Sequence, residues 1–111
     1  MEIARTIVNA LEEKKGENIT IIDIEEIADF AAYFVICSGT SNRMIQSLLD
    51  SAMDVVKKKH RISARIEGTS HDGWMLADFG DVILHVFSPA QRDYYRLEEL
   101  WNEGKVLLHL Q

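Results

Sequence analysis

A turn that contains serine and glycine, Ser38-Gly39-Thr40-Ser41, is the first place in this chain where the residue types suggest chemistry. It follows an apolar run and precedes a helical pattern, a position where backbone N–H groups can cradle a phosphate. The turn matches neither a Walker loop nor a dinucleotide-binding fingerprint. We therefore predict a helix-capping turn and keep a phosphate-binding loop as the alternative.

Two carboxylates, Asp78 and Asp81, raise the question of a metal-dependent enzyme. Nucleotidyltransferases pair a glycine-serine turn with two carboxylates at alternate positions of one strand, which hold the metal ions. Asp78 and Asp81 are three residues apart across a turn and do not meet this requirement. The four histidines show no metal-ligand spacing. We predict no metal site, no cofactor and no catalytic residue, and a nucleotide-binding or nucleotidyltransferase-like enzyme stays the alternative.

The other reactive side chains are predicted to be structural. Cys37 is the only cysteine and ends the apolar run 33–37, which is typical of a buried thiol. His85 lies between Leu84 and Val86 in a strand pattern. This position favours a hydrogen-bonded core or interface histidine over a catalytic base.

The first half of the chain predicts two helices and two strands. Apolar residues at helical spacing predict a helix over residues 2–15, and β-branched or wholly apolar runs predict strands over 19–23 and 33–37. A second helix follows, with Ser41 as its N-cap and its end near Lys59. The run 33–37 has no polar face, as in a strand that helices cover on both sides.

The second half predicts three more strands. Alternating apolar residues predict a strand over 62–66, and a polar loop over 68–73 follows it. Gly80-Asp81 lies between two apolar runs, which predicts a two-residue hairpin joining strands over 74–79 and 82–87.

A final helix is marked by its first residues. Ser88 as the cap and Pro89 at the first helical position predict a helix that runs to about Trp101. Tyr94, Leu97 and Trp101 would share the face that packs on the sheet.

Composition bounds the class of protein. The chain has 111 residues, 47% of them hydrophobic and 27% charged, which suits one α/β domain over residues 1–111 with a mixed sheet of about five strands flanked by helices. Residues 106–110 are an apolar tail that adds an edge strand or docks on the core. No apolar run reaches the roughly 20 residues that span a bilayer, so we expect a cytoplasmic protein with no membrane partner.

Charge is distributed unevenly along the chain, whose net charge is −6. Residues 31–65 carry six basic and two acidic side chains, whereas residues 66–111 carry three basic and eight acidic ones together with both tryptophans. Phosphate binding needs clustered Lys and Arg, so the acidic aromatic region favours a basic protein partner and little direct contact with RNA.

Four blocks follow one another in the chain: Tyr33–Ser41, Glu67-Gly68, Trp74–Phe87 and Arg92–Trp101. Together they closely resemble the ribosomal silencing factor family, RsfS, also called the Iojap-related family, over roughly residues 3–103. The resemblance implies a non-enzymatic factor with a nucleotidyltransferase-like topology that lacks the catalytic carboxylates.

The resemblance also implies a partner and a mechanism. Members of the family dock on the large ribosomal subunit through its universal ribosomal protein number fourteen. Docking there sterically blocks joining of the small subunit and represses translation under nutrient limitation, and organellar relatives are associated with maturation of the large subunit.

The partner-binding residues are predicted in the acidic aromatic region, because aromatic anchors and carboxylates suit a basic partner. They are Trp74, Met75, Leu76, Asp78, Phe79, Gly80, Asp81, Tyr95 and Glu98. Alternate strand residues face opposite sides, so only one of the two sets within 74–79 can meet a partner, and the sequence leaves both options open. Trp101 is predicted to lie in the core. A homodimer of the free protein that uses the same region is a further alternative.

Overall fold

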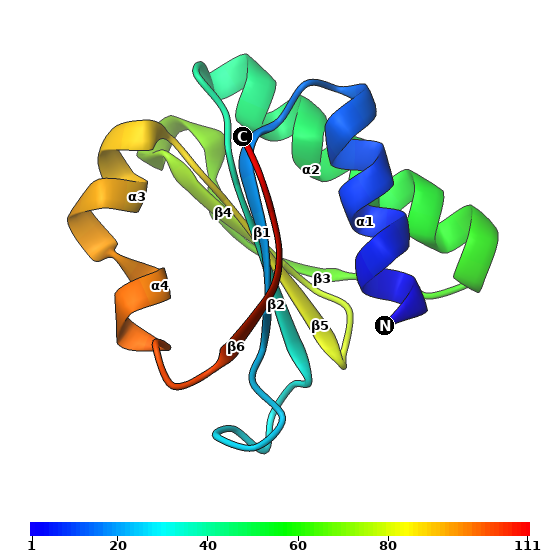
Figure 1. Ribbon diagram of the computed structural model, residues 1–111. Helices are drawn as coiled ribbons and strands as arrows, with labels where there is room; N and C mark the ends of the chain where they lie inside the picture. The colour runs from blue at the N-terminus through cyan, green and yellow to red at the C-terminus, as the bar shows by residue number, and fades with distance from the viewer.

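A mixed six-stranded sheet separates two layers of helices in the computed structural model, which describes residues 1–111 (Figure 1). The strands are β1 (Glu17–Asp23), β2 (Tyr33–Ser38), β3 (Arg65–Thr69), β4 (Trp74–Asp78), β5 (Val82–Phe87) and β6 (Lys105–Leu110). The helices are α1 (Glu2–Glu13), α2 (Asn42–His60), α3 (Pro89–Tyr95) and α4 (Leu97–Leu100), with a 3₁₀ turn at Ser70–Asp72. The strand order is β3-β4-β5-β2-β1-β6, and β2 and β5 form the only parallel pair.

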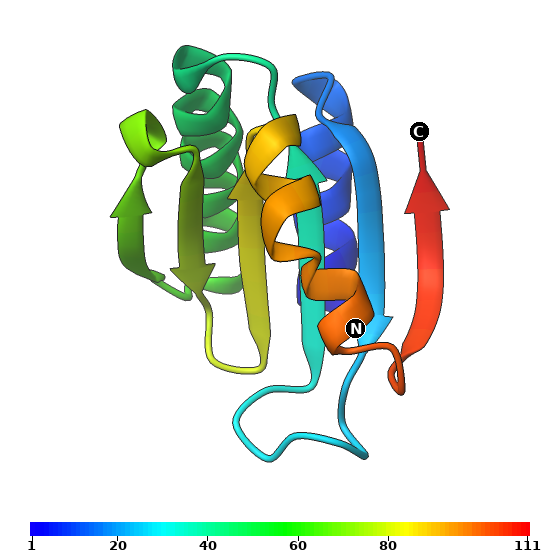
Figure 2. The same ribbon diagram turned by 90° about the vertical axis from the view of Figure 1, so that its left-hand side faces the viewer.

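The two helical layers are unequal. Helices α1 and α2 pack on one face of the sheet, and the short helices α3 and α4 lie on the other (Figures 1 and 2). Beneath α1 and α2 lies a core cluster of 19 buried residues, whereas the cluster beneath α3 and α4 has 8. The predicted α/β class with a mixed sheet is confirmed. The sheet has six strands instead of about five because the C-terminal tail pairs with β1 as the edge strand β6.

The central strand β2 confirms the prediction for an apolar run without a polar face. Five of its six residues are buried, including Cys37, and helices cover both of its sides. Helix α2 begins as predicted at Ser41, whose hydroxyl accepts a hydrogen bond from the Met44 N–H at 3.0 Å. Both elements contribute buried residues to the larger core cluster.

The hairpin between β4 and β5 is also confirmed. The Phe79 N–H donates to the Val82 carbonyl at 2.9 Å, so Gly80 and Asp81 are the two loop residues. Gly80 has a φ of 96°, a left-handed value that favours glycine. The Asp78 carboxylate accepts a hydrogen bond from the Gly80 N–H at 2.8 Å and fixes the turn.

The third strand lies further along the chain than predicted. It occupies Arg65–Thr69 instead of residues 62–66, because its position is set by antiparallel pairing of Thr69 with Trp74 and of Glu67 with Leu76. Ile62 and Ala64 precede the strand and pack against the core from the loop. The predicted polar loop is correspondingly shorter, because Gly68 and Thr69 belong to β3 and Ser70–Asp72 form the 3₁₀ turn.

The predicted final helix is two helices. Its start is confirmed, because the Ser88 hydroxyl accepts from the Gln91 N–H at 3.2 Å and Pro89 is the first helical residue. The helix ends at Arg96, its C-cap, whose φ of 48° is left-handed, and α4 begins at the next residue. Tyr94 is consequently 78% exposed and does not pack on the sheet, which corrects the prediction of a shared face.

Leu97 and Trp101 do reach the core side. Leu97 is buried, and Trp101 packs edge-on against Phe34 with ring centroids 5.3 Å apart. Trp101 is partly buried and packs against the smaller core cluster, which agrees with the predicted packing role. None of the helices combines the length and the apolar character that crossing a membrane requires.

Candidate functional site

The face that strand β4 presents is settled by the tertiary structure. Met75, Ala77 and Phe79 point toward α1 and α2 and belong to the larger core cluster. Trp74 and Leu76 lie on the opposite side, are half-buried, and pack against the smaller cluster. Of the two alternating sets in the predicted site, the one that contains Trp74, Leu76 and Asp78 is accessible.

Helices α3 and α4 leave part of this side uncovered. In Figure 2 they cross in front of β5 and β2, while β3 and β4 stand free at the left. We call this uncovered side of β3 and β4, with Glu67, Trp74, Leu76 and Asp78, the open face. Between the open face and α3 lies a cavity of about 320 Å³. Its lining residues are Glu67, Gly68, Asp72, Trp74, Leu76 and Tyr95.

Trp74 is held in one orientation on the open face. Its indole N–H donates to Nδ1 of His85 at 3.2 Å. Its ring stacks on Phe87 at a centroid distance of 4.8 Å and lies 4.6 Å from the ring of Tyr95. Tyr95 therefore reaches the open face from α3, although it is separated from β4 in sequence.

His85 supports Trp74 from within the sheet. It is 4% exposed, which confirms the predicted hydrogen-bonded core histidine. Burial disfavours the imidazolium and lowers the pKa of His85 to about 4. The neutral ring accepts the hydrogen bond from the indole N–H at Nδ1 and carries its own proton at Nε2, a buried atom without a hydrogen-bond partner.

The turn at the end of β4 brings together three other predicted residues. Gly80 and Asp81 are exposed, and Asp78 is partly exposed. The Asp78 carboxylate also lies 3.8 Å from a guanidinium nitrogen of Arg65 on β3. The turn therefore extends the open face with two carboxylates.

Glu98 has an intramolecular partner. Its carboxylate accepts two hydrogen bonds from Arg92, one from Nη2 at 2.7 Å and one from Nε at 3.2 Å. The same guanidinium donates to the Ser38 hydroxyl at 3.0 Å and to the Thr20 hydroxyl at 3.3 Å. Arg92 thus joins α3, α4, β1 and β2, a role that sequence reasoning missed because Arg92 and Glu98 are six residues apart and would not face each other on one continuous helix.

The Ser38–Ser41 turn uses its polar groups internally. The Gly39 N–H donates to the Phe87 carbonyl at 2.8 Å, and the Thr40 N–H contacts the Met44 sulfur at 3.4 Å. Ser38 is buried and its hydroxyl accepts a hydrogen bond from Arg92, and Ser41 caps α2. Two amides that would have to face a phosphate are thus engaged, as expected for a capping turn. No group of three or more His, Cys, Asp or Glu side chains has an arrangement that could hold a metal ion.

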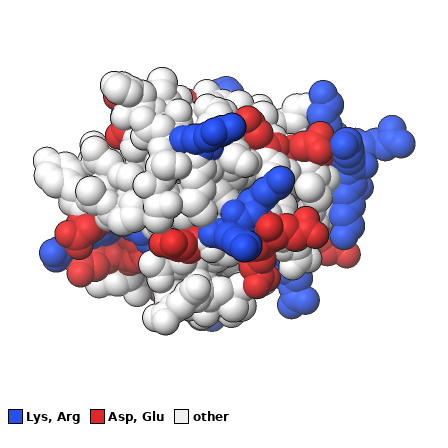
Figure 3. Space-filling view, turned by 90° about the horizontal axis from the view of Figure 1, so that it is seen from above, with Lys and Arg blue, Asp and Glu red and all other residues white.

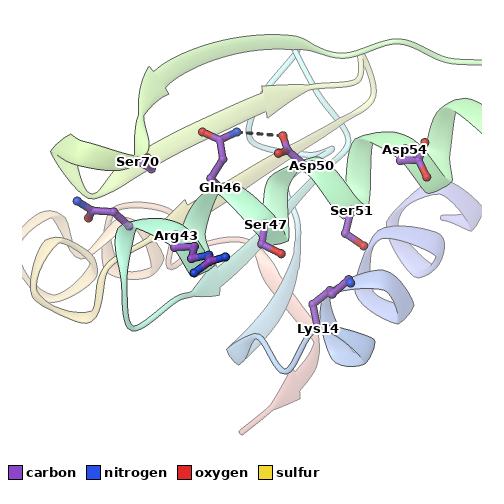
Figure 4. A pocket seen from close by; sticks show the side chains of 9 residues that line it. Lys14, Arg43, Gln46, Ser47, Asp50, Ser51, Asp54 and Ser70 are labelled. Atoms are coloured by element: carbon purple, nitrogen blue, oxygen red, sulfur yellow. Dashed lines mark hydrogen bonds between the residues drawn. The ribbon is translucent and has the colours of Figure 1, made fainter.

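A larger hollow, of about 620 Å³, lies elsewhere and has a different character. It runs along α2 between Lys14 and Ser70 and has no hydrophobic lining residue (Figure 4). Arg43, Asp50 and Lys14 place charges of both signs along it, and Gln46 donates to Asp50 at 2.9 Å. Seen from above, Lys and Arg gather at the right edge, on the side of α1 and α2, whereas much of the left half, on the side of α3, is uncharged (Figure 3). The aromatic rings of the candidate site distinguish it from this polar helix surface.

The fold and the open face define a class of protein: an α/β domain that presents an aromatic sheet surface bordered by carboxylates. The model of the family described as "Ribosomal silencing factor during starvation", RsfS, matches residues 1–110. The chain belongs to this ribosomal silencing factor family.

Individual relatives agree in sequence and in structure. The chain is 34% identical to Ribosomal silencing factor RsfS of Halalkalibacterium halodurans over 103 residues, which is 93% of this chain and 88% of that protein. A crystal structure of a Chromobacterium violaceum protein superposes with a TM-score of 0.87 at 32% identity and covers 99% of this chain and 91% of the other. Mitochondrial assembly of ribosomal large subunit protein 1 of Mus musculus is 32% identical over 86% of this chain and 43% of its own length.

Proposed function

We propose that this protein is a cytoplasmic ribosomal silencing factor. It binds the large ribosomal subunit through the universal ribosomal protein number fourteen and sterically blocks joining of the small subunit, which represses translation under nutrient limitation. Its bacterial relatives carry the name ribosomal silencing factor, and the mouse relative is named for assembly of the large ribosomal subunit. Family membership therefore supports a regulatory role on the ribosome.

The main structural support for this proposal is Trp74, whose indole is held in a fixed orientation on the open face. Its hydrogen bond to His85 and its stacking on Phe87 hold the indole before a partner arrives. A side chain that is already ordered loses little rotamer entropy on binding, so its buried area contributes more fully to affinity. Leu76 and Tyr95 extend the apolar surface beside it.

Charge supports a basic protein as the partner. Asp78 and Asp81 flank the turn at the end of the open face, and Glu67 lies on β3 beside Leu76. These carboxylates would attract and orient a basic ribosomal protein and repel RNA phosphates. We propose little direct RNA contact from this face.

The predicted residues then fall into three groups. Direct contacts are proposed for Trp74, Leu76, Asp78, Gly80, Asp81 and Tyr95. Met75 and Phe79, each 5% exposed, support the face from beneath, and Glu98 acts through Arg92 on the position of α3 and α4.

Separated ribosomal subunits test the proposal. The protein should sediment with isolated large subunits, and adding it before small subunits should reduce the yield of joined ribosomes. Leu76→Ala should weaken both effects, whereas Leu107→Ala, at an exposed leucine of the edge strand β6, should leave them unchanged. Absence of co-sedimentation, or normal joining in saturating protein, would overturn the proposal.

A homodimer of the free protein is a competing use of the same apolar surface. Light scattering with and without the ribosomal partner distinguishes the two uses. A dimer that dissociates when the partner is added would place both contacts on the open face. A monomer at all concentrations would remove self-association from the proposal.

A further inference from the structure

The cavity between the open face and α3 combines an apolar floor with an acidic rim. Trp74, Leu76 and Tyr95 form its apolar part, and Glu67 and Asp72 are its charged lining residues. No lysine, arginine or histidine lines it. At about 320 Å³ the cavity has room for one long side chain.

Both carboxylates are available to a partner. The four ion pairs of the structure involve neither Glu67 nor Asp72. Asp72 is held in place because the Thr69 hydroxyl donates to its Oδ2 at 2.9 Å, which leaves Oδ1 free. Glu67 projects from β3 directly beside Leu76.

We propose that this cavity receives a single arginine or lysine side chain of the protein that docks on the open face. This inference rests on the proposed docking function and names the group that the face recognises. The aliphatic stem of such a side chain packs on Leu76 and the aromatic rings, while its cationic head reaches the carboxylates at the rim. The neighbouring rings of Trp74 and Tyr95 add a favourable interaction with the cation.

The same features exclude other occupants. A phosphate would meet two unpaired carboxylates, and an aspartate or glutamate of a partner would be repelled in the same way. A neutral apolar side chain would fill the floor but leave the two carboxylates desolvated without a counter-charge. Glu67 and Asp72 therefore make the cavity selective for a cation.

Isosteric neutral variants test the inference on the ribosome. Glu67→Gln with Asp72→Asn removes two charges and keeps the shape and the Thr69 hydrogen bond. We expect the affinity for isolated large subunits to fall about tenfold at low salt and to depend less on salt concentration. The matched control is Glu12→Gln with Glu13→Gln, which removes two charges from exposed positions on α1 across the sheet and should change the affinity less than about twofold.

A measurement without the ribosome separates this inference from the proposed function. N-acetyl-arginine amide should shift the NMR resonances of the Trp74 indole N–H and the Gly68 amide, and N-acetyl-citrulline amide, its neutral analogue, should shift them much less. The difference should vanish in the Glu67→Gln, Asp72→Asn variant. Equal shifts for both ligands, or wild-type affinity of the variant for large subunits, would overturn the cation pocket while leaving ribosome docking intact. Failure of the wild-type protein to bind large subunits would overturn the docking proposal instead.

Discussion

The indole N–H of Trp74 donates a hydrogen bond to Nδ1 of His85 over 3.2 Å, so a half-buried surface anchor and a buried histidine act as one unit. The bond fixes the neutral tautomer of His85 with its proton on Nε2. Phe34 lies edge-on to the imidazole at a centroid distance of 4.8 Å and helps to exclude water from it. Protonation of His85 would remove the acceptor that orients Trp74.

This pairing predicts a pH-dependent stability. The pKa of His85 is about 4 in the folded protein and about 6.5 when unfolded, so between these values the unfolded chain binds a proton that the folded chain does not. The free energy of unfolding should therefore fall as the pH falls from 6.5 to 4, by about 3 kcal/mol from this group. His85→Gln keeps an acceptor for the indole but does not titrate. In urea unfolding at a series of pH values, this variant should therefore lose less free energy of unfolding than the wild-type protein as the pH falls from 6.5 to 4.

The control for this comparison is His71→Gln, because His71 is exposed on the 3₁₀ turn. Its pH profile should match that of the wild-type protein. Identical profiles for wild type and His85→Gln would show that His85 is not buried in the neutral form.

The fork between Arg92 and Glu98 predicts a strong pairwise coupling. The Arg92 side chain is 11% exposed and that of Glu98 is 36% exposed, so water screens the pair only in part. A double-mutant cycle with Arg92→Lys and Glu98→Gln should give a coupling of about 1–2 kcal/mol, because lysine cannot reproduce the planar bidentate contact. The exposed pair Asp54 and Lys58 should give about 0.5 kcal/mol or less in the same urea measurements. Equal coupling in the two pairs would contradict the proposed joining role of Arg92.

Charge reversal at the hairpin should weaken docking. Asp78→Lys and Asp81→Lys should each lower the affinity for large subunits about tenfold without unfolding the domain, measured by sedimentation and circular dichroism. Glu13→Lys on α1 is the matched control, and Asp78→Asn separates the charge from the hydrogen bond to Gly80. Unchanged affinity in both reversals would remove these residues from the interface.

Two glycines of the site should respond differently to alanine. Gly80 has a φ of 96° and no atom within 4 Å of an added Cβ, so Gly80→Ala should cost only backbone strain, about 1–2 kcal/mol. Gly68 has a φ of 84°, and an added Cβ would also press on the Trp74 carbonyl oxygen, so Gly68→Ala should cost about 3 kcal/mol. Urea unfolding measures both variants. The reverse order would mean that β3 moves easily away from β4.

Cys37 should be inert in the folded protein. Its side chain is fully buried in β2, and burial raises the pKa of the thiol to about 12. Labelling by a thiol reagent in native buffer should be at least about 100-fold slower than in urea, because reaction requires unfolding. Rapid labelling of the folded protein would show that β2 is accessible from one side.

Local sequence signals were sufficient to predict an element wherever the contact that stabilises it lies within a few residues. Ser41 caps α2 three residues away, Ser88 caps α3 in the same manner, and Gly80 supplies the left-handed φ of its own turn. The wholly apolar strand β2 likewise predicted its own double burial. Each of these outcomes follows from short-range geometry that the residue types specify.

Contacts between distant segments decided the remaining features. The break at Arg96 allows Arg92 to meet Glu98 while reaching Ser38 and Thr20, which no helical period reveals. The position of β3 follows from its pairing with β4, and β6 exists because β1 offers a free edge.

The candidate site shows the same division. The sequence by itself determined its region, its aromatic and acidic composition, and its family resemblance. It could not choose between Trp74 and Met75 as the outward-facing residue. Both alternating sets of β4 residues include apolar side chains, so either set could face the core. Only the tertiary structure decided this: α2 covers one side of β4, while α3 and α4 stop short on the other (Figure 2). Trp74 therefore stays at the surface, where His85 and Tyr95 contact it.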